Sequence, residues 1–370
     1  MREVTGYPVT VAPGARRNVA ALAAKATTAY RFAIITDETV RDLYAKEIAA
    51  TFAPAEPLLL AVPSGEMYKT RESWARLTDS LLASGYGRDS AIIAVGGGVV
   101  GDLAGFVAAT FMRGVPVIQV PTTLLAMIDA SIGGKTGVDT QHGKNLVGAF
   151  HRPSAVIVDP TVLATLPPRE LRAGLAEAIK HGVIADGAYL QRIEKAIPTL
   201  LAPDGHASGA MIELIIRSIE VKAGIVERDE HEGGLRKVLN FGHTLGHAIE
   251  SLGGYELLHG EAISIGMALE AEVGERAGIS ARGTADAVRK VLEAAGLPSL
   301  RPLGLDPERL IEVARGDKKT RAGSIELAVP LEIGSMAGEN TGWAARIGEE
   351  LIQEVLEERS EERRVGKECS

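Results

Sequence analysis

The sequence predicts an α/β domain with a parallel sheet, followed by an all-α domain. In the first half, short apolar runs alternate with helical stretches, a pattern typical of a parallel sheet covered by helices. The second half is helical in pattern, and residues 240–261 hold three of the chain's eight histidines. We expect residues 1–165 to form the first domain, residues 166–356 the second, and residues 357–370 a charged, disordered tail.

Five apolar, β-branched runs in the first half are predicted strands. They lie at residues 32–36, 58–62, 90–95, 115–120 and 155–158. Amphipathic helices are expected between them, at residues 40–52, 73–83 and 102–111. The glycine-rich stretch between the last two strands has poor apolar alternation, so we expect loops there. Ligands of a parallel sheet gather at the carboxyl ends of its strands, where Asp37 and the polar loop at residues 64–69 fall.

A glycine-rich turn follows the strand at residues 90–95 and precedes a predicted helix. Its sequence, GGGVVG at residues 96–101, matches G-x-G-x-x-G, in which glycines let the backbone approach a pyrophosphate held by helix N-terminal amides. The turn follows a later strand than the first, and no acidic residue stands about 20 positions further on to hold a ribose. We therefore expect a variant, Rossmann-like nucleotide-binding domain.

The second half is predicted to be built from helices. They are expected at residues 170–184, 211–227, 262–277, 285–295, 308–314 and 342–356, with a further helix around His243 and an isolated strand at 325–329. On the first of these helices, Glu177, Lys180 and His181 share one face. An unpaired carboxylate among the alanines of this helix would be costly. Either a metal ion or an ion pair with Lys180 would offset that cost.

The histidine cluster suggests a metal site. His243 and His247 are four residues apart and share a helix face, which Asn240 joins. Imidazole suits zinc, and on spacing alone these two histidines form a ligand pair that Glu177 or His259 completes. Three protein ligands with an open fourth position are typical of a catalytic zinc. The alternative is a helix with hydrogen-bonded core histidines.

Cations are spread among the glycines and helices of a chain whose net charge is −8. This acidic balance argues against a general nucleic-acid binder, whereas lysines in glycine-rich loops suit phosphate or carboxylate groups. The alternative is that the loop lysines are simply solvated. The candidate anion-binding residues are Lys135, Lys144, Lys180, Lys222, Arg236 and Lys318. A dinucleotide together with a metal predicts hydride transfer at a carbinol carbon.

The cellular location is predicted from what the sequence lacks. No run of 18 apolar residues could span a membrane, and the N-terminal segment has no apolar core of a signal peptide. The single cysteine, Cys369, excludes disulfides within the chain and fits a reducing compartment. We expect a cytoplasmic protein.

Six long motifs lie within residues 96–267: GGGVVGDLAGFVAATFMRG, VPTTLLAMIDASIGGKTGVD, GKNLVGAFHRP, LPPRELRAGLAEAIKHG, NFGHTLGHAIE and LHGEAISIGM. On these motifs the chain resembles the 3-dehydroquinate synthase family of sugar-phosphate cyclases, over about residues 30–335. The resemblance implies an NAD-binding α/β domain followed by a helical, metal-binding domain. It also implies the shikimate-pathway conversion of 3-deoxy-D-arabino-heptulosonate 7-phosphate to 3-dehydroquinate and phosphate.

The resemblance further implies roles for single residues. The metal, zinc or cobalt, would be held by Glu177, His243 and His259, and His247 would face the substrate instead. The substrate would meet Lys135, Asn145, Lys180, Lys222, Arg236, Asn240, His247 and Lys318, with Asp129 near the nicotinamide. NAD would contact Asp37, Ser64, Gly65, Glu66, Lys69, Gly97, Gly98, Val99, Gly101, Asp102, Thr122, Thr123, Lys135, Lys144, Val162 and Thr165. Family members are commonly homodimers, in which the arginine corresponding to Arg113 reaches the partner's active site.

The implied chemistry is a closed redox cycle on a phosphorylated sugar acid. The C5 hydroxyl is oxidised, phosphate leaves by elimination, the ketone is reduced again, and an intramolecular aldol step closes the carbocycle. Two alternatives remain open: an NAD- and metal-dependent polyol dehydrogenase of the same fold, and a related cyclase that makes an inosose or a valiolone. Asn240 and His247 together favour the dehydroquinate enzyme.

Overall fold

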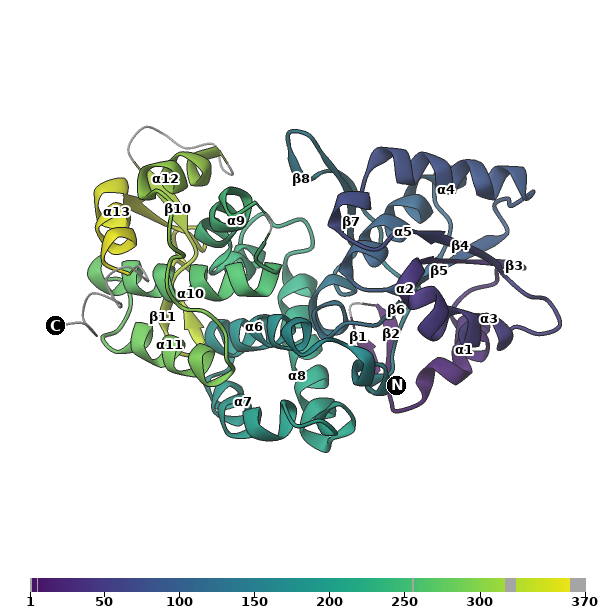
Figure 1. The fold of residues 1–370 in the computed structure, drawn as a ribbon, viewed down its shortest axis with the longest axis horizontal. Helices are drawn as coiled ribbons and strands as arrows, with labels where there is room; N and C mark the ends of the chain where they lie inside the picture. Colours follow the sequence, from purple (N-terminus) through teal and green to yellow (C-terminus); the bar gives the residue numbers. More distant parts are fainter. Residues whose placement is uncertain (1, 5, 255, 317–323, 360–370) are drawn as a thin grey trace. The chain divides into compact units, whose positions relative to one another are not determined.

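The computed structural model describes residues 2–4, 6–254, 256–316 and 324–359 of the 370-residue chain (Figure 1). The chain folds into two compact units, which are described separately below. The first unit contains Met1–Pro167 and Ala202–Ala223, and the second contains Pro168–Leu201 and Gly224–Ser370. The expected boundary at residue 165 treats each domain as one continuous segment, whereas residues 202–223 return to the first unit.

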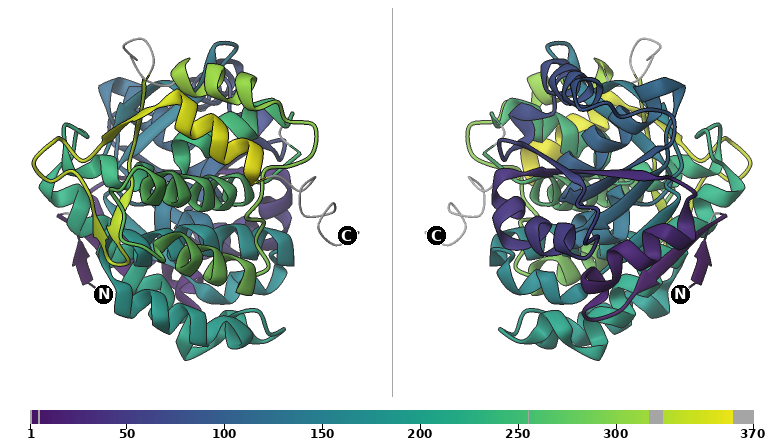
Figure 2. Two further views of the ribbon diagram at one scale, coloured as in Figure 1. Left: turned by 90° about the vertical axis from the view of Figure 1, so that its left-hand side faces the viewer. Right: turned by 90° about the vertical axis from the view of Figure 1, so that its right-hand side faces the viewer.

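The first unit contains a seven-stranded sheet in the order β1-β2-β9-β6-β5-β3-β4. The right-hand view of Figure 2 shows the purple and blue elements of this unit from a second direction. Its strands are β1 (Arg2–Val4), β2 (Tyr7–Val11), β3 (Arg31–Asp37), β4 (Leu58–Val62), β5 (Ser90–Gly96), β6 (Val117–Pro121) and β9 (Ala155–Val158). β1 pairs antiparallel with β2, and the other neighbouring strands pair in parallel. The parallel sheet and all five predicted strands are confirmed, while β1 and β2 were not predicted. β5 is buried along its whole length, as its continuous apolar run requires in a central parallel strand.

The helices of the first unit include the three that were predicted, with shifted ends, and one that was not predicted, α1. They are α1 (Val19–Ala26), α2 (Glu38–Val40), α3 (Lys46–Ala50), α4 (Arg71–Ala83) and α5 (Gly98–Thr110). The helix expected at residues 40–52 is interrupted between α2 and α3 by a wider π-helical turn, Arg41–Ala45. α5 begins at Gly98, earlier than expected, so the second half of the glycine-rich turn lies inside the helix. Leu103 and Val107 of α5 pack with Ile92 of the sheet in one apolar core.

A β-hairpin occupies the stretch where loops were expected. β7 (Lys135–Thr140) and β8 (Gly143–Phe150) pair antiparallel, so the loop prediction is wrong. The alternation of apolar and polar residues that marks a strand is hard to see in this hairpin, because glycines occupy positions where its two backbones approach closely. A Cβ atom at Gly148 would lie 2.2 Å from the Thr136 carbonyl oxygen, and one at Gly105 of α5 would lie 2.4 Å from Thr136 Cγ2. Close pairing of the two hairpin strands requires glycine at position 148, although glycine is a poor strand former, and contact of Thr136 with α5 requires glycine at position 105.

The second unit is largely helical rather than all-α. Its helices are α6 (Pro168–Ala185), α7 (Gly187–Leu200), α9 (His243–Leu252), α10 (His259–Arg276), α11 (Thr284–Ala294), α12 (Pro307–Gly316) and α13 (Glu349–Glu358), and α8 (Gly209–Arg228) ends in it. Two small antiparallel sheets pair β10 (Ser324–Leu327) with β13 (Ala345–Gly348) and β11 (Pro330–Glu332) with β12 (Ser335–Met336).

These sheets correct two predictions for the C-terminal part of the chain. The strand near residues 325–329 exists but is paired rather than isolated. The helix expected at residues 342–356 starts only at Glu349, because residues 345–348 pair with β10. It then extends to Glu358, two residues into the expected tail, and the tail beyond residue 359 lies outside the described residues. α7 was not predicted.

Candidate functional site

Three helices of the second unit bring Glu177, His243 and His259 together. Glu177 lies within α6, whereas His243 and His259 are the first residues of α9 and α10. One ligand atom from each residue lies within 4.8 Å of the other two. The Nε2 atoms of His243 and His259 are 3.6 Å and 3.7 Å from Glu177 Oε1. The three residues that the family resemblance assigns to the metal therefore form one cluster.

The burial of Glu177 indicates that a cation belongs in this cluster. The side chain is 0 % exposed, and among the described residues neither carboxylate oxygen accepts a hydrogen bond. An ion pair joins Oε2 to the Lys180 ammonium, while Oε1 faces the two imidazoles. Although burial raises the pKa of Glu177, Lys180 and the histidines hold it well below its ordinary value. An ionised, buried oxygen facing two ring nitrogens suits a divalent metal with N and O ligands.

The outer ring nitrogens of both histidines also fit a metal centre. His243 Nδ1 lies 3.1 Å from the Phe241 carbonyl oxygen, and His259 Nδ1 lies 3.6 Å from Glu250 Oε2. Ligating histidines ordinarily hold the second nitrogen against such an acceptor, which fixes the tautomer and the ring orientation. Glu250 was not predicted, although its position three residues after His247 in the sequence is a usable signal for a shared helix face.

The two histidines differ in their charge state. Burial, and then the nearby Lys180, hold the pKa of His243 well below its ordinary value. Burial also lowers the pKa of His259, but Glu177 and Glu250 outweigh it and raise that pKa to about 9. At neutral pH the metal-free protein therefore holds a protonated His259 between two carboxylates. Binding a cation at His259 Nε2 releases this proton, because a ligating imidazole is neutral.

Glycine contacts set the spacing of the three helices. A Cβ atom at Gly260 of α10 would lie 2.0 Å from the Ala173 carbonyl oxygen of α6. A Cβ atom at Gly266 of α10 would lie 1.9 Å from the Gly242 carbonyl oxygen, just before α9. Backbone therefore touches backbone on both sides of α10, and side chains larger than hydrogen do not fit.

His247 and Asn240 take different positions from those the spacing alone predicted. His247 is exposed on α9, with its ring centroid 5.2 Å from that of His243, and it groups with Glu250 and His259 rather than with Glu177. Asn240 does not share the helix face of His243. It ends a 3₁₀ turn, Leu235–Asn240, and Gly242 with φ +78° breaks the chain direction before α9 starts. The side-chain amide of Asn240 donates to Glu232 Oε1 at 2.7 Å.

The predicted cations differ strongly in burial. In the second unit, Lys180 and Arg236 are 1 % and 2 % exposed, and the Arg236 guanidinium donates to the Glu230 carbonyl oxygen. In the first unit, Lys222 Nζ donates to Asp129 Oδ1 at 2.6 Å and to the Asp129 carbonyl oxygen at 2.7 Å.

The remaining predicted cations lie at the surface or outside the described residues. Lys135 is exposed at the start of β7. Arg113 is exposed and has φ +68°. The Nζ atom of Lys144 lies 3.6 Å from Glu66 Oε1. Lys318 lies outside the described residues.

In the first unit, the glycine-rich turn leaves the N-terminus of α5 bare. Gly97 precedes α5 and supplies no side-chain cap, so the first amides of α5 suit an anion. A Cβ atom at Gly97 would lie 3.1 Å from Thr123 Cγ2, and one at Gly101 would lie 3.0 Å from Gln119 Oε1. The Thr122 amide donates to the Gly96 carbonyl oxygen at 2.9 Å, and the Thr123 hydroxyl accepts from the Ala126 amide at 3.1 Å.

A polar cluster around the buried Lys69 adjoins this turn. Lys69 Nζ donates to Asp102 Oδ2 at 2.6 Å and to Asn145 Oδ1 at 2.5 Å. Burial raises the pKa of Asp102, and Lys69 opposes this rise. Lys69 and Asp102 were assigned to the nucleotide and Asn145 to the substrate, so residues of both predicted sets meet here. Asn145 itself has φ +57°, and its amide donates to Asp139 Oδ1 at 2.9 Å.

The other residues assigned to the nucleotide lie at the ends of neighbouring strands. Asp37 ends β3 and accepts hydrogen bonds from the Val40 amide and the Ser64 hydroxyl, both at 2.9 Å. Gly65 continues the Ser64 loop with φ +119°. Tyr44 was not predicted, but its hydroxyl donates to the Val162 carbonyl oxygen at 3.0 Å and lies 2.7 Å from Thr165 Oγ1.

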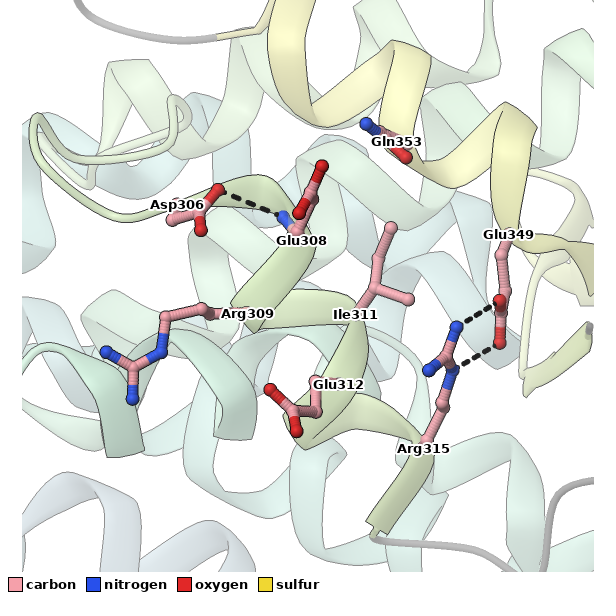
Figure 3. Close-up of a pocket in the computed structure, with 8 residues that line it drawn as sticks. All are labelled: Asp306, Glu308, Arg309, Ile311, Glu312, Arg315, Glu349 and Gln353. Atoms are coloured by element: carbon pink, nitrogen blue, oxygen red, sulfur yellow. Dashed lines mark hydrogen bonds and ion pairs between the residues drawn. The ribbon is translucent and has the colours of Figure 1, made fainter.

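A surface depression of the second unit lies apart from these residues (Figure 3). It is lined by Asp306, Glu308, Arg309, Ile311, Glu312, Arg315, Glu349 and Gln353. Arg315 forms two bonds with the Glu349 carboxylate, at 2.5 Å and 2.6 Å. None of the predicted site residues lines this depression, and the Arg315–Glu349 pair joins α12 to α13 there. No helix in the described part of the chain is long and apolar enough to cross a membrane.

Comparison with known proteins gives a consistent result. Sequence models described as 3-dehydroquinate synthase N-terminal and 3-dehydroquinate synthase C-terminal match residues 59–173 and 174–320. A 3-dehydroquinate synthase of Pelobacter propionicus is 45 % identical over 307 residues, which cover 82 % of this chain and 84 % of that protein.

Two solved structures of sugar cyclases have a similar fold. A 2-deoxy-scyllo-inosose synthase complexed with carbaglucose-6-phosphate, NAD⁺ and Co²⁺ has a TM-score of 0.86 and 28 % identity, covering 95 % of this chain and 96 % of that one. The 2-epi-5-epi-valiolone synthase of Streptomyces hygroscopicus subsp. jinggangensis, with NAD⁺ and Zn²⁺ bound, has a TM-score of 0.83 and 32 % identity, covering 96 % and 97 %.

Proposed function

The chain belongs to the 3-dehydroquinate synthase family, and from that premise we propose how its own residues carry the reaction. It is an enzyme, a phosphorus–oxygen lyase with the 3-dehydroquinate synthase activity of the shikimate pathway. The observation that carries the proposal is the buried Glu177, whose Oε1 faces the Nε2 atoms of two histidines. The substrate is 3-deoxy-D-arabino-heptulosonate 7-phosphate, and the products are 3-dehydroquinate and phosphate.

Glu177, His243 and His259 hold one divalent metal, zinc or cobalt, and the first unit holds NAD. The two cyclases with NAD⁺ and either Co²⁺ or Zn²⁺ bound support this assignment. When bound, the metal polarises the C5 hydroxyl oxygen and NAD accepts and later returns a hydride. Glu250 and the Phe241 carbonyl orient the two imidazoles, and Lys180 keeps Glu177 ionised.

The bare N-terminus of α5 and the glycines Gly97, Gly98 and Gly101 receive the pyrophosphate of NAD. Its remaining contacts come from Asp37, Ser64, Gly65, Glu66, Lys69, Val99, Asp102, Thr122, Thr123, Lys135, Lys144, Val162 and Thr165. The Lys69–Asp102 pair gives this cluster a fixed shape, since the Lys69 ammonium donates to both Asp102 and Asn145.

The substrate's phosphate and carboxylate bind the buried cations Lys180, Lys222 and Arg236, together with Lys135, Asn145, Asn240 and His247. Each of these cations already has an acceptor: Lys180 pairs with Glu177, Lys222 with Asp129, and Arg236 donates to the Glu230 carbonyl oxygen. Such partners hold the cationic groups in place, and charged donors form the stronger hydrogen bonds to phosphate and carboxylate groups. Asp129 orients Lys222 through two hydrogen bonds from the ammonium. Lys318 is a further proposed contact of the substrate, predicted from the sequence alone.

The active enzyme is a cytoplasmic homodimer in which Arg113 reaches the partner's site. Two features support a second copy. Met112 and Arg113 both have positive φ, at +52° and +68°, a strained arrangement that holds an exposed arginine outward. β8, whose described pairing is with β7 alone, carries Leu146 and Phe150 with exposed fractions of 64 % and 48 %. An exposed apolar edge strand favours pairing with another chain.

The test is a turnover assay with substoichiometric NAD. The purified enzyme, zinc and the heptulosonate phosphate are mixed, and both phosphate release and absorbance at the NADH band are followed. We expect phosphate far in excess of the NAD added, with no net NADH. Accumulating NADH would identify a polyol dehydrogenase. Bound NAD and metal without any phosphate release would point to a related cyclase that takes another sugar phosphate, or to a pseudoenzyme.

A further inference from the structure

The helix that presents His243 has no cap of its own. The first amides of a helix lack partners within the helix and need acceptors from elsewhere. Gly242 stands at the cap position of α9, in the left-handed region with φ +78°, and supplies no side chain. The usual solution, a serine or aspartate before the helix, is therefore absent at α9.

Glu270 of α10 supplies the missing acceptors. Its Oε2 accepts from the Gly242 amide at 2.7 Å, and its Oε1 accepts from the Leu245 amide at 2.9 Å. These are the cap amide and the third amide of the helix, the same two that a capping box satisfies from within its own helix. Glu270 is 0 % exposed, and a negative charge at a helix N-terminus is favourable.

Close packing explains why the acceptor comes from a second helix. A Cβ atom at Gly242 would lie 2.4 Å from Met267 Cγ and 2.9 Å from the Ile263 carbonyl oxygen. No serine or aspartate fits at this position. The same close approach of α10 that excludes a local cap places the Glu270 carboxylate within reach of both amides.

The two anchored amides flank a predicted metal ligand. His243 is the first residue of α9, between Gly242 and Leu245, and its Nε2 lies 3.6 Å from Glu177 Oε1. We propose that Glu270 is a positioning residue for the metal centre, fixing the start of α9 so that His243 meets the metal held by Glu177 and His259. The inference rests on the proposed metal-dependent function. Glu270 touches neither metal nor substrate in this role.

The experiment measures metal binding directly. Glu270→Gln keeps the shape but replaces one acceptor by an NH₂ group that faces a backbone N–H, so one hydrogen bond is lost. Cobalt serves as a visible probe of a site that suits zinc. We expect the Kd for Co²⁺, measured by titration of its d–d absorption, to rise by about 10-fold, as is typical for outer-sphere changes. The shape of the cobalt spectrum should change as well, because His243 is displaced.

Glu272→Gln is the matched control. Glu272 lies on the same helix and also accepts charged hydrogen bonds, from Arg276 at 3.0 Å, Arg289 at 3.2 Å and Arg359 at 2.8 Å. It does not contact α9 in the described hydrogen bonds. This variant should lower the unfolding temperature yet leave the cobalt Kd and spectrum as in the wild type. Glu270→Asp, which keeps the charge but shortens the side chain, should give a smaller rise in Kd and supplies a second variant if Glu270→Gln does not fold.

The outcomes separate the inference from the proposed function. A wild-type chain that binds neither zinc nor cobalt would overturn both. Wild-type cobalt binding together with an unchanged Kd and spectrum in a folded Glu270 variant would overturn only the positioning role, even if that variant is less stable. A higher cobalt Kd in Glu270→Gln but not in Glu272→Gln supports the positioning role of Glu270, whether or not phosphate is released in the turnover assay.

Discussion

Glu177 lies in the middle of α6 with both carboxylate oxygens buried. Its neighbours keep its pKa well below the ordinary value, so it is ionised at neutral pH, as the proposed metal ligand must be. We expect Glu177→Gln to lower activity by at least about 100-fold, since a neutral amide is a poor metal ligand. Zinc affinity, measured by competition with a chelator, should fall in parallel while far-UV circular dichroism stays unchanged.

Glu170→Gln is the control for this prediction. Glu170 is in the first turn of the same helix, where burial raises its pKa, and it belongs to no predicted ligand set. Its substitution should leave zinc affinity unchanged. Full activity of Glu177→Gln would mean that Glu177 only pairs with Lys180, the structural alternative already evident from the sequence.

Asp159, which follows β9, gives a pH-dependent prediction. It accepts hydrogen bonds from Arg16 Nη1 at 2.8 Å, the Gly14 amide at 2.9 Å and the Thr161 hydroxyl at 2.6 Å. Burial raises its pKa, but the bonds from Thr161, Arg16 and Gly14 outweigh burial and lower it below the ordinary value. A depressed carboxyl pKa contributes stability above the unfolded pKa, about 3.9, and this contribution is lost as pH falls through the folded pKa.

We therefore expect Asp159→Asn to lower the free energy of unfolding of the first unit by about 1.5–3 kcal/mol near neutral pH. The difference from the wild type should shrink as the pH is lowered below about 3.9. Urea unfolding of both proteins at several pH values measures it. A difference that stays constant down to acid pH would show that packing, rather than the carboxylate charge, is responsible.

At the scale of elements, the contact of α10 with α6 gives the next prediction. In Gly260→Ala, the added methyl group would meet the Ala173 carbonyl oxygen at 2.0 Å, so the two helices must separate. Overpacking of this kind costs about 1–3 kcal/mol. It should also weaken zinc binding, because Glu177 lies on α6 and His259 begins α10. The unfolding midpoint and the zinc Kd are the two readouts.

Gly224→Ala is the matched glycine control, since a Cβ atom at this position of α8 would meet nothing within 4 Å. The exchange should raise stability by about 0.5–1 kcal/mol and leave zinc binding unchanged. Loss of zinc affinity in Gly224→Ala but not in Gly260→Ala would contradict the role assigned to the helix contact.

Elements with apolar periodicity could be predicted from the sequence, and elements shaped by glycine contacts could not. The five predicted strands and most helices follow from apolar runs that must be buried. β7 and β8 were missed because Gly137 and Gly148 stand where side chains would otherwise show the alternation. Asn240 was placed on a helix because spacing alone does not reveal the positive φ at Gly242.

The candidate site shows the same division. Histidines four residues apart and a carboxylate in an apolar helix indicated a metal before any contact was known. Glu250 and Glu270 were not predicted, because each contacts a residue of another segment. Glu250 of α9 lies near His259 at the start of α10, and Glu270 of α10 accepts from Gly242 just before α9. Glu270 acts on a distant segment of the chain and leaves no regular spacing, whereas Glu250 could have been found from its position three residues after His247.

At the scale of the whole molecule, each unit has an apolar core of its own. One core contains Ile92 and Leu103, and the other contains Leu245 and Leu269. We expect calorimetry of the metal-free chain to resolve two transitions. Zinc at about 100 times its Kd should stabilise the second unit by about 2.7 kcal/mol and raise only its transition, while NAD should raise the other.

Glu177→Gln provides the control, because zinc should then shift neither transition. A single unfolding transition whose temperature rises with either zinc or NAD would show that the two units unfold together, and would contradict the expectation that their cores unfold independently. Domain boundaries drawn as continuous segments could not anticipate the return of residues 202–223 to the first unit, since the sequence of α8 is uninterrupted there.

The backbone contacts on both sides of α10 also bear on the choice of metal. Side chains can yield to a larger ion, but two peptide groups already in contact cannot move closer, and Glu270 resists separation of α9 from α10. The distances between the helices are therefore fixed. Only the imidazole rings of His243 and His259 and the Glu177 carboxylate can adjust to the radius of an ion. We expect such a frame to favour small ions with four short bonds at the proposed site and to discriminate against Ca²⁺, which requires six to eight oxygens at longer distance.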